Sequence, residues 1–290
     1  MLSAIDRLKI QAKYKLYKNR FPFNPVFLIG CGRSGTTILG HSIGSHPEIC
    51  YLNERLDIWN KAYPEFDIWS GQTAEPILEA DETHLHPEKT TKLRYELHLE
   101  QAVSQSKLVL EKTPINNFRL TFLQVAFPNA RYVYLHRNGL DVARSIERLS
   151  SKGGWYGKNG NSKWQVLKRL IEQKTTYQPD ALSFYEKALL EWRFSMERSE
   201  QFFNQLDSSR FYSLSYASFL ENPAFQLKQI YDFLNLEINE ITLTKAANKI
   251  ERKSDKLQQP THHEIELGGP YLKLSVENKL RQSSPNAKGG

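Results

Sequence analysis

Cysteine and long apolar runs are scarce in this chain of 290 residues. Its two cysteines, Cys31 and Cys50, are too few for a disulfide scaffold and fit a reducing compartment. No stretch approaches the ~20 consecutive apolar residues of a membrane-spanning helix. The first twenty residues also lack the apolar core of a secretory signal, because basic residues interrupt every candidate. The interrupting residues are Arg7, Lys9, Lys13, Lys15 and Lys18. We therefore expect a globular, cytoplasmic protein.

Histidines with the spacing of metal ligands are missing as well. His262 and His263 are adjacent, and His84 and His86 lie in a polar segment, so we expect all four at the surface and no bound metal. Basic residues outnumber acidic ones by 39 to 32, which gives a net charge of +7. This excess favours an anionic ligand or surface but does not by itself indicate nucleic acid, and we expect no nucleic-acid partner.

The N-terminal segment, residues 1–24, differs in character from the rest of the chain. Apolar Leu2, Ile5, Leu8 and Leu16 are interspersed with six basic residues and one acidic residue. The segment is either a peripheral helix with a solvated charged face or a basic amphipathic helix in contact with a membrane surface. We expect a single domain over residues 25–282 and a disordered tail of small, polar residues over 283–290.

Short apolar runs alternate with helical patterns along residues 25–282. Strands are predicted at 26–29, 107–110, 131–135 and 211–216, and this alternation is typical of an α/β fold with a parallel sheet. A helical region rich in Trp and Lys is predicted at 162–203, as an insertion. The Gly-, Lys- and Asn-rich residues 152–161 before it have the composition of a mobile loop or lid.

A glycine-rich turn, residues 30–37, follows the first predicted strand. Its glycines allow backbone N–H groups to converge on one anion, and the helix after the turn adds its positive end. The turn also carries one guanidinium and three hydroxyls, next to its last glycine: Arg33, Ser34, Gly35, Thr36 and Thr37. A nucleoside-triphosphate loop ends in Gly-Lys-Ser/Thr, and that lysine is missing here. Cys31 is expected to be a packing residue.

A second candidate anion site follows the third predicted strand. Arg137 stands at the strand end, and Ser145 lies eight residues later, in the second turn of the helix expected to begin at Gly139. The alternative is an ordinary surface ion pair between Arg137 and Asp141. Because ligands of open α/β sheets bind at the carboxyl ends of the strands, the two sites together favour a nucleotide with phosphates at both ends.

These motifs resemble those of the sulfotransferases that use 3′-phosphoadenosine 5′-phosphosulfate. The 30–37 turn is similar to the family's 5′-phosphosulfate loop, Arg137 with Ser145 to its 3′-phosphate motif, and Tyr216 through Asn222-Pro223 to a later segment. The likeness is nearest to the tyrosylprotein and carbohydrate branches. It implies a P-loop-like, three-layer fold whose central parallel sheet is flanked by helices. It also implies that Tyr216 is a nucleotide contact; Ser254 is a weaker candidate.

The resemblance also implies catalytic residues. Glu54, twenty-one residues beyond Arg33, matches the position of the branch's catalytic carboxylate, and Lys112 matches its lysine. Glu54 would then be the general base, while Lys112 and Arg33 stabilise the charge of the transition state. The alternative for Glu54 is an ion pair with Arg55 or another cation.

Three functions remain open at this point. The first is sulfuryl transfer to a hydroxyl of a carbohydrate, lipid, small metabolite or peptide tyrosine, leaving adenosine 3′,5′-bisphosphate and requiring no metal. The second is an ATP-dependent kinase, against which the missing lysine argues. The third is a nucleotide-binding protein without catalysis, against which Glu54 and Lys112 argue. Trp155, Tyr156 and Trp164 either stack on the acceptor or belong to the core.

Overall fold

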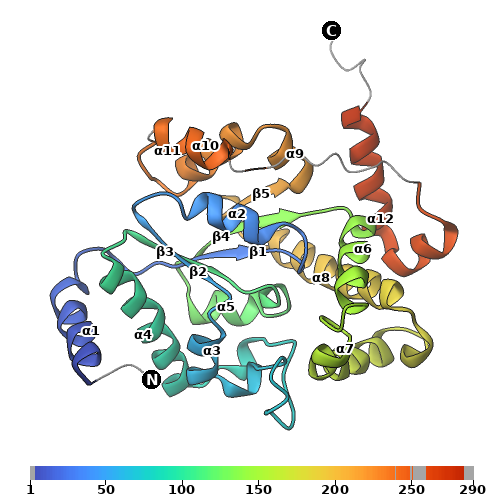
Figure 1. Ribbon diagram of the computed structural model, residues 1–290, viewed down its shortest axis with the longest axis horizontal. Helices are drawn as coiled ribbons and strands as arrows, with labels where there is room; N and C mark the ends of the chain where they lie inside the picture. The colour runs from blue at the N-terminus through green and yellow to red at the C-terminus, as the bar shows by residue number, and fades with distance from the viewer. Residues whose placement is uncertain (1–3, 239, 249, 251–258, 284–290) are drawn as a thin grey trace, which may run out of the picture.

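The computed structural model describes residues 4–238, 240–248, 250 and 259–283 (Figure 1). Its centre is a five-stranded sheet in the order β2-β3-β1-β4-β5, in which every neighbouring pair is parallel. The strands are β1 (Val26–Ile29), β2 (Ile49–Asn53), β3 (Leu108–Lys112), β4 (Arg131–His136) and β5 (Phe211–Ser215). Four of them lie within two residues of their predicted bounds. Since all five run in one direction, their carboxyl ends lie along one edge of the sheet.

Helices cover both faces of the sheet, as expected for a three-layer α/β fold (Figure 1). Val26 and Leu28 of β1 contribute to one apolar cluster, and Phe27 and Ile29 contribute to another, because successive residues of a strand point to opposite faces. The first cluster includes residues of α2 (Thr36–Ile43), α9 (Tyr216–Glu221), α10 (Pro223–Phe233) and α11 (Glu240–Asn248). The second includes residues of α3 (Leu56–Ala62), α4 (Pro87–Ser104) and α5 (Leu120–Ala126).

A further group of helices packs beside the sheet and forms a third apolar cluster (Figure 1). Its members are α6 (Gly139–Ser150), α7 (Asn161–Lys174), α8 (Phe184–Phe203) and α12 (His262–Ser283), the last kinked at Gly269. The predicted helical region 162–203 is thus two helices, α7 and α8, and Ser183 caps the second by accepting from the N–H of Glu186. In the glycine-rich segment 152–161 between α6 and α7, Tyr156 is buried in this cluster, whereas Lys152, Lys158 and Asn161 are exposed.

The two ends of the chain are described in part. Helix α1 (Ala4–Tyr17) lies in the N-terminal segment and packs against α4. Near the other end, Asn222 caps α10 by accepting from the N–H of Phe225. A stripe of apolar residues along α10 and its C-cap is buried: Leu227, Ile230, Tyr231 and Leu234. Ser254 and the tail beyond Ser283 lie outside the described residues.

Candidate functional site

The glycine-rich turn connects β1 to α2 and depends on two close backbone approaches. Gly35 has a φ of 98°, in the left-handed region, and a Cβ there would lie 2.3 Å from the ring of Tyr216. A Cβ on Gly32 would lie 2.4 Å from the indole of Trp155. These positions therefore require glycine for space, and Gly35 requires it for backbone conformation as well. Arg33 shares the left-handed region, with a φ of 70°.

Lys112 joins the start of α2 to the end of β2. Its Nζ donates to Thr37 Oγ1 at 2.9 Å and to Glu54 Oε1 at 2.5 Å. The pairing of β2 with β3 explains this geometry, because Asn53 lies opposite Lys112 and the N–H of Glu54 donates to the Lys112 carbonyl. The Lys112 side chain is 1% exposed and that of Glu54 is 45% exposed. A buried ammonium thus holds a carboxylate that is open to solvent.

Arg137 and Ser145 meet the glycine-rich turn on its other side. Arg33 Nε donates to Ser145 Oγ at 3.3 Å, and Arg137 Nη1 donates to the Arg33 carbonyl at 3.4 Å. The Arg137 guanidinium lies 4.3 Å from the centroid of the Tyr216 ring. As predicted, Gly139 begins α6, and Asn138 caps that helix by accepting from the N–H of Leu140. Two guanidinium groups and a hydroxyl therefore converge where β4 ends.

These groups line one cavity of about 330 Å³. Of the residues proposed from the sequence, nine line it: Arg33, Gly35, Thr36, Thr37, Glu54, Lys112, Arg137, Ser145 and Tyr216. Ser34 does not line it, because the tight turn, in which its N–H donates to the Cys31 carbonyl, leaves its side chain buried. The lining residues that were not proposed for the nucleotide are Gly32, Ile38, Pro114 and Trp155. A larger cavity of about 450 Å³, between α5 and α8, shares no lining residue with it.

Trp155, one of the three aromatic residues considered for the acceptor, is a large side chain in the cavity wall. Its Nε1 donates to Glu191 Oε2 at 3.0 Å, and Lys163 Nζ lies 3.7 Å from its ring centroid. Glu191 also accepts from Lys163 at 2.6 Å and from the hydroxyl of Tyr156. Lys163 and Glu191 are both buried, and burial lowers the pKa of Lys163. Their buried ion pair anchors Trp155. Tyr156 and Trp164, the other aromatic residues considered for the acceptor, are buried in the core.

Cys31 is buried within the same turn. Burial, and the nearby Glu191 carboxylate, raise the pKa of its thiol, so the thiol is protonated at neutral pH. This environment is that of a packing residue. In the part of the chain that the structure describes, no group of three or more His, Cys, Asp or Glu side chains is arranged to hold a metal ion.

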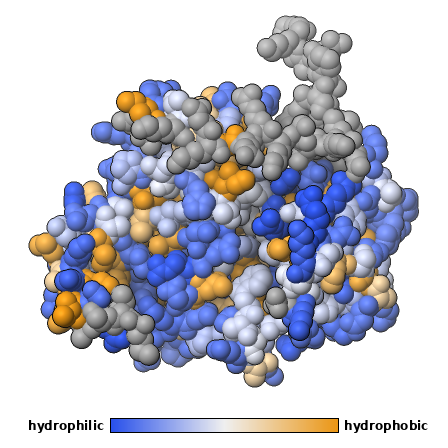
Figure 2. Space-filling view, in the orientation of Figure 1, coloured by the Kyte–Doolittle hydropathy of each residue, from blue (hydrophilic) through white to orange (hydrophobic). Residues whose placement is uncertain are grey.

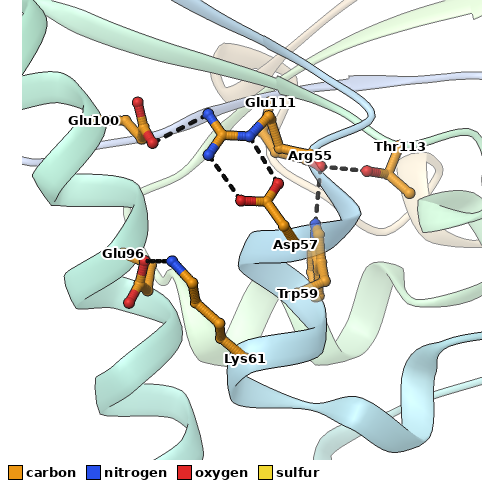
Figure 3. Close-up of polar contacts among 8 residues, drawn as sticks. All are labelled: Arg55, Asp57, Trp59, Lys61, Glu96, Glu100, Glu111 and Thr113. Carbon is orange, nitrogen blue, oxygen red and sulfur yellow. Dashed lines mark hydrogen bonds and ion pairs between the residues drawn. The ribbon is translucent and has the colours of Figure 1, made fainter. Parts of the chain in front are cut away.

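A polar network around Arg55 fixes the start of α3 (Figure 3). Arg55 binds Asp57 through two hydrogen bonds and pairs with Glu100 of α4 at 3.0 Å. Its guanidinium is therefore engaged by Asp57 and Glu100, whereas Glu54 pairs with Lys112. Deeper in the fold, Glu111 accepts from Trp59, Thr113 and Asn116. Burial raises the pKa of Glu111 to about 6, and the hydrogen bonds from Thr113 and Trp59 oppose that rise.

Replacing Gly35 with alanine should disrupt this cavity and abolish binding of the predicted nucleotide. The new Cβ would be strained at positive φ, at a cost of about 1–2 kcal/mol, and would displace the Tyr216 ring from the cavity wall. Gly153→Ala is the matched control, because Gly153 also has a positive φ (91°) but nothing lies within 4 Å of its added Cβ. Thermal unfolding and ligand titration of both variants measure the two effects separately. Equal behaviour of the two variants would show that the contact with Tyr216 is unimportant.

The chain is similar in sequence to known proteins. The sequence model of the sulfotransferase family matches residues 25–240. An uncharacterized protein of Aquifex aeolicus (strain VF5) is 29% identical over 148 residues, which cover 48% of this chain and 19% of that protein. The chain thus spans about a fifth of the length of this relative.

The chain is also similar to solved sulfotransferase structures. Sulfotransferase STF9 from Mycobacterium avium superposes with a TM-score of 0.53 at 14% identity, covering 96% of this chain and 82% of that one. This likeness supports the assignment of the fold. Mouse sulfotransferase SULT7A1, solved in complex with PAP, has a TM-score of 0.45 at 14% identity and covers 96% of this chain and 90% of its own.

Proposed function

Because the chain belongs to the sulfotransferase family, we propose that it transfers a sulfuryl group from 3′-phosphoadenosine 5′-phosphosulfate to an acceptor hydroxyl. One observation carries the proposal. A single cavity brings together the start of α2, two guanidinium groups and a carboxylate that is bonded to a buried lysine. The first two features suit an anionic nucleotide, and the third suits the proton transfer that the reaction needs.

The residues present fit the donor at two places. The turn and the first residues of α2, with Thr37 and Lys112, would hold the 5′-phosphosulfate, since helix starts and turn N–H groups favour anions. Arg137 and Ser145 would hold the 3′-phosphate, for which a planar guanidinium is well suited. The donor supplies the activated sulfuryl group, which passes to the acceptor oxygen as adenosine 3′,5′-bisphosphate leaves.

We assign Glu54 the role of general base in this reaction. Its exposed carboxylate can accept the proton of an acceptor hydroxyl, while its hydrogen bond to Lys112 fixes its direction. The φ of 54° at Glu54 is a strained conformation for a residue with a side chain, and such strain is common where a side chain must be aimed. Lys112 and Arg33 would stabilise charge that develops on the bridging and sulfuryl oxygens.

The proposed acceptor is a hydroxyl compound of one of four classes: carbohydrate, peptide tyrosine, lipid or small metabolite. Trp155 and Pro114 add apolar surface to the cavity wall, and such surface can contact a sugar ring, a tyrosine side chain, a lipid or a small metabolite. Screening hydroxyl compounds of these four classes with labelled donor would identify the acceptor. The same screen would distinguish an enzyme from a protein that only binds the nucleotide.

A thermal-shift experiment tests the donor assignment. Adenosine 3′,5′-bisphosphate at a hundred times its Kd should stabilise the protein by about 2.7 kcal/mol, whereas ATP with magnesium should have no comparable effect. Stabilisation by ATP and magnesium alone would contradict the proposal and favour a kinase. Stabilisation by neither compound would remove the evidence for two phosphate sites.

Replacing Arg137 with alanine should weaken binding of the bisphosphate more than it changes any other property of the protein. Loss of a charged hydrogen-bond donor to the 3′-phosphate should cost roughly 2–4 kcal/mol of binding free energy. Arg148→Ala changes an exposed arginine in the last turn of α6, the helix that follows Arg137; it is the control and should bind normally. Isothermal titration calorimetry measures both affinities. An unchanged Kd for the Arg137 variant would remove this residue from the phosphate site.

A further inference from the structure

Helix α1 has two apolar faces, and the inner one is already occupied. Tyr14 packs against α4, with its ring centroid 5.1 Å from that of Tyr95 and 5.5 Å from that of His98. Gln11 Nε2 donates to the Tyr95 hydroxyl at 3.0 Å, and the carbonyl of Lys18, just after the helix, lies 2.9 Å from His98 Nε2. These contacts fix the rotation of α1 about its axis. Its other face therefore points permanently away from the core.

The outer face carries large apolar side chains in solvent. Ile5 is 64% exposed, Leu8 is 70% exposed and Leu16 is 72% exposed. At 100° per residue these three positions fall within an arc of about 80°, with the small side chain of Ala12 between them. Figure 2 shows apolar residues gathered on this side of the molecule, where Figure 1 places α1. We refer to Ile5, Leu8, Ala12 and Leu16 as the outer stripe.

Basic side chains border the outer stripe on both sides. Lys9 and Lys13 follow it on one side and Lys15 on the other, as their helical angles require. The single acidic residue of the helix, Asp6, is half-buried and lies beyond Lys13, about 80° from the nearest edge of the outer stripe. A narrow apolar stripe between lysines suits an anionic lipid surface, since the leucines enter the acyl boundary while the ammonium groups reach phosphate. A second copy of the same face would instead bring lysines against lysines.

We propose that α1 binds anionic lipid membranes through the outer stripe and its bordering lysines. The helix lies in the plane of the headgroups, because no helix among the described residues is long and apolar enough to span a bilayer. The attachment is reversible, as expected for a short stripe combined with charge attraction. This inference does not depend on the proposed enzymatic activity, since α1 contributes no residue to the catalytic cavity.

Vesicle co-sedimentation of the full chain tests the proposal. The protein should sediment with phosphatidylcholine vesicles that contain about 30% phosphatidylserine, remain in solution with pure phosphatidylcholine, and be released by high salt. Replacing Lys9, Lys13 and Lys15 together with glutamine should lower the partition coefficient about 100-fold, since each basic residue contributes severalfold near such a surface. Leu8→Gln with Leu16→Gln should lower it at least about tenfold.

Matched controls separate the outer stripe from exposed apolar surface in general. Val125→Gln with Phe225→Gln removes two side chains that are 50% and 51% exposed on α5 and α10, and it should leave vesicle binding unchanged. All variants should keep the unfolding temperature and nucleotide affinity of the parent. Absence of binding, equal binding to neutral vesicles, or equal loss in the control would overturn the proposal. So would a dimer in light scattering that the leucine replacements dissociate, because it would assign the stripe to a second copy.

Discussion

Replacing Glu54 with glutamine should lower the turnover number about 10²–10⁴-fold while leaving the affinity for adenosine 3′,5′-bisphosphate unchanged. Glutamine has the shape of glutamate and keeps an oxygen that can accept from Lys112 Nζ, so the cavity wall is preserved. It cannot take a proton from the acceptor hydroxyl. A proton-transfer role therefore predicts a loss confined to kcat, measured with labelled donor and calorimetric titration of the product nucleotide.

Asp57→Asn is the matched control for this experiment. Asp57 lies three residues from Glu54 and binds Arg55, and its side chain is 54% exposed. Its replacement removes a carboxylate from the same segment without changing the cavity, so turnover should be near normal. If the Glu54 variant retained turnover, the carboxylate would serve as the ion-pair partner of Lys112 and no more. If it lost catalysis and nucleotide binding together, its role would be structural.

Replacing Glu191 with alanine should destabilise the protein by about 3–5 kcal/mol. The change would leave the buried ammonium of Lys163 without its counter-charge and would remove the acceptor of Trp155 Nε1 and the Tyr156 hydroxyl. Adding Lys163→Met should restore much of the loss, since the unpaired charge is then gone. Chemical denaturation of the two single variants and the double variant measures the coupling.

Glu197→Ala on the same helix provides the comparison. Glu197 pairs with Arg193 at 2.8 Å, but these side chains are 28% and 26% exposed, so the loss should stay below about 1 kcal/mol. A small effect at both sites would mean that water reaches Lys163. The Glu191 variant should also show a raised KM for the acceptor, because Trp155 would no longer be held against Gly32.

The Glu191→Ala variant should also become more stable as pH rises from neutral. Burial lowers the pKa of Lys163 in the folded state, and loss of the neighbouring carboxylate would lower that pKa further. The unfolded chain keeps this proton up to a pKa of about 10.4. Between the two pKa values the unfolded state binds more protons, so the free energy of unfolding increases with pH. Denaturation midpoints at neutral and alkaline pH would reveal the rise, and a flat or falling profile would contradict it.

The parts of the fold that could be predicted are those whose structure is determined by residues that are neighbours in the sequence. β1 is buried on both faces, so it appears as the continuous apolar run Val26 to Ile29, and the glycine-rich turn is contiguous. β2 lies at the edge of the sheet, and its mixed exposure gives no such run. It is absent from the four predicted strands, and only Glu54, just after its end, was singled out, through the family resemblance.

The anchor of Trp155 could not be predicted, for a different reason. Lys163 and Glu191 are 28 residues apart on two helices, and nothing in either helical pattern selects that partner. A lysine in a helix is usually solvated, so the pattern favoured exposure. Burial arises because α7 and α8 pack together beside the sheet and leave the pair enclosed by Trp69, Trp155 and Tyr156. Side-chain pairing between elements depends on the packing angles of the whole fold.

The contact between Gly35 and Tyr216 has a consequence for the order of events during synthesis. The glycine-rich turn emerges early, and β1 can pair with β3 and β4 once those strands are made. The Tyr216 ring that rests on the turn comes much later, at the start of α9, after β5 has joined the edge of the sheet. Contacts between distant parts of a chain close late in folding. If the proposed nucleotide binds against this ring, a nascent chain would acquire its complete binding site only when the last strand is in place, and binding would then report that the sheet is complete.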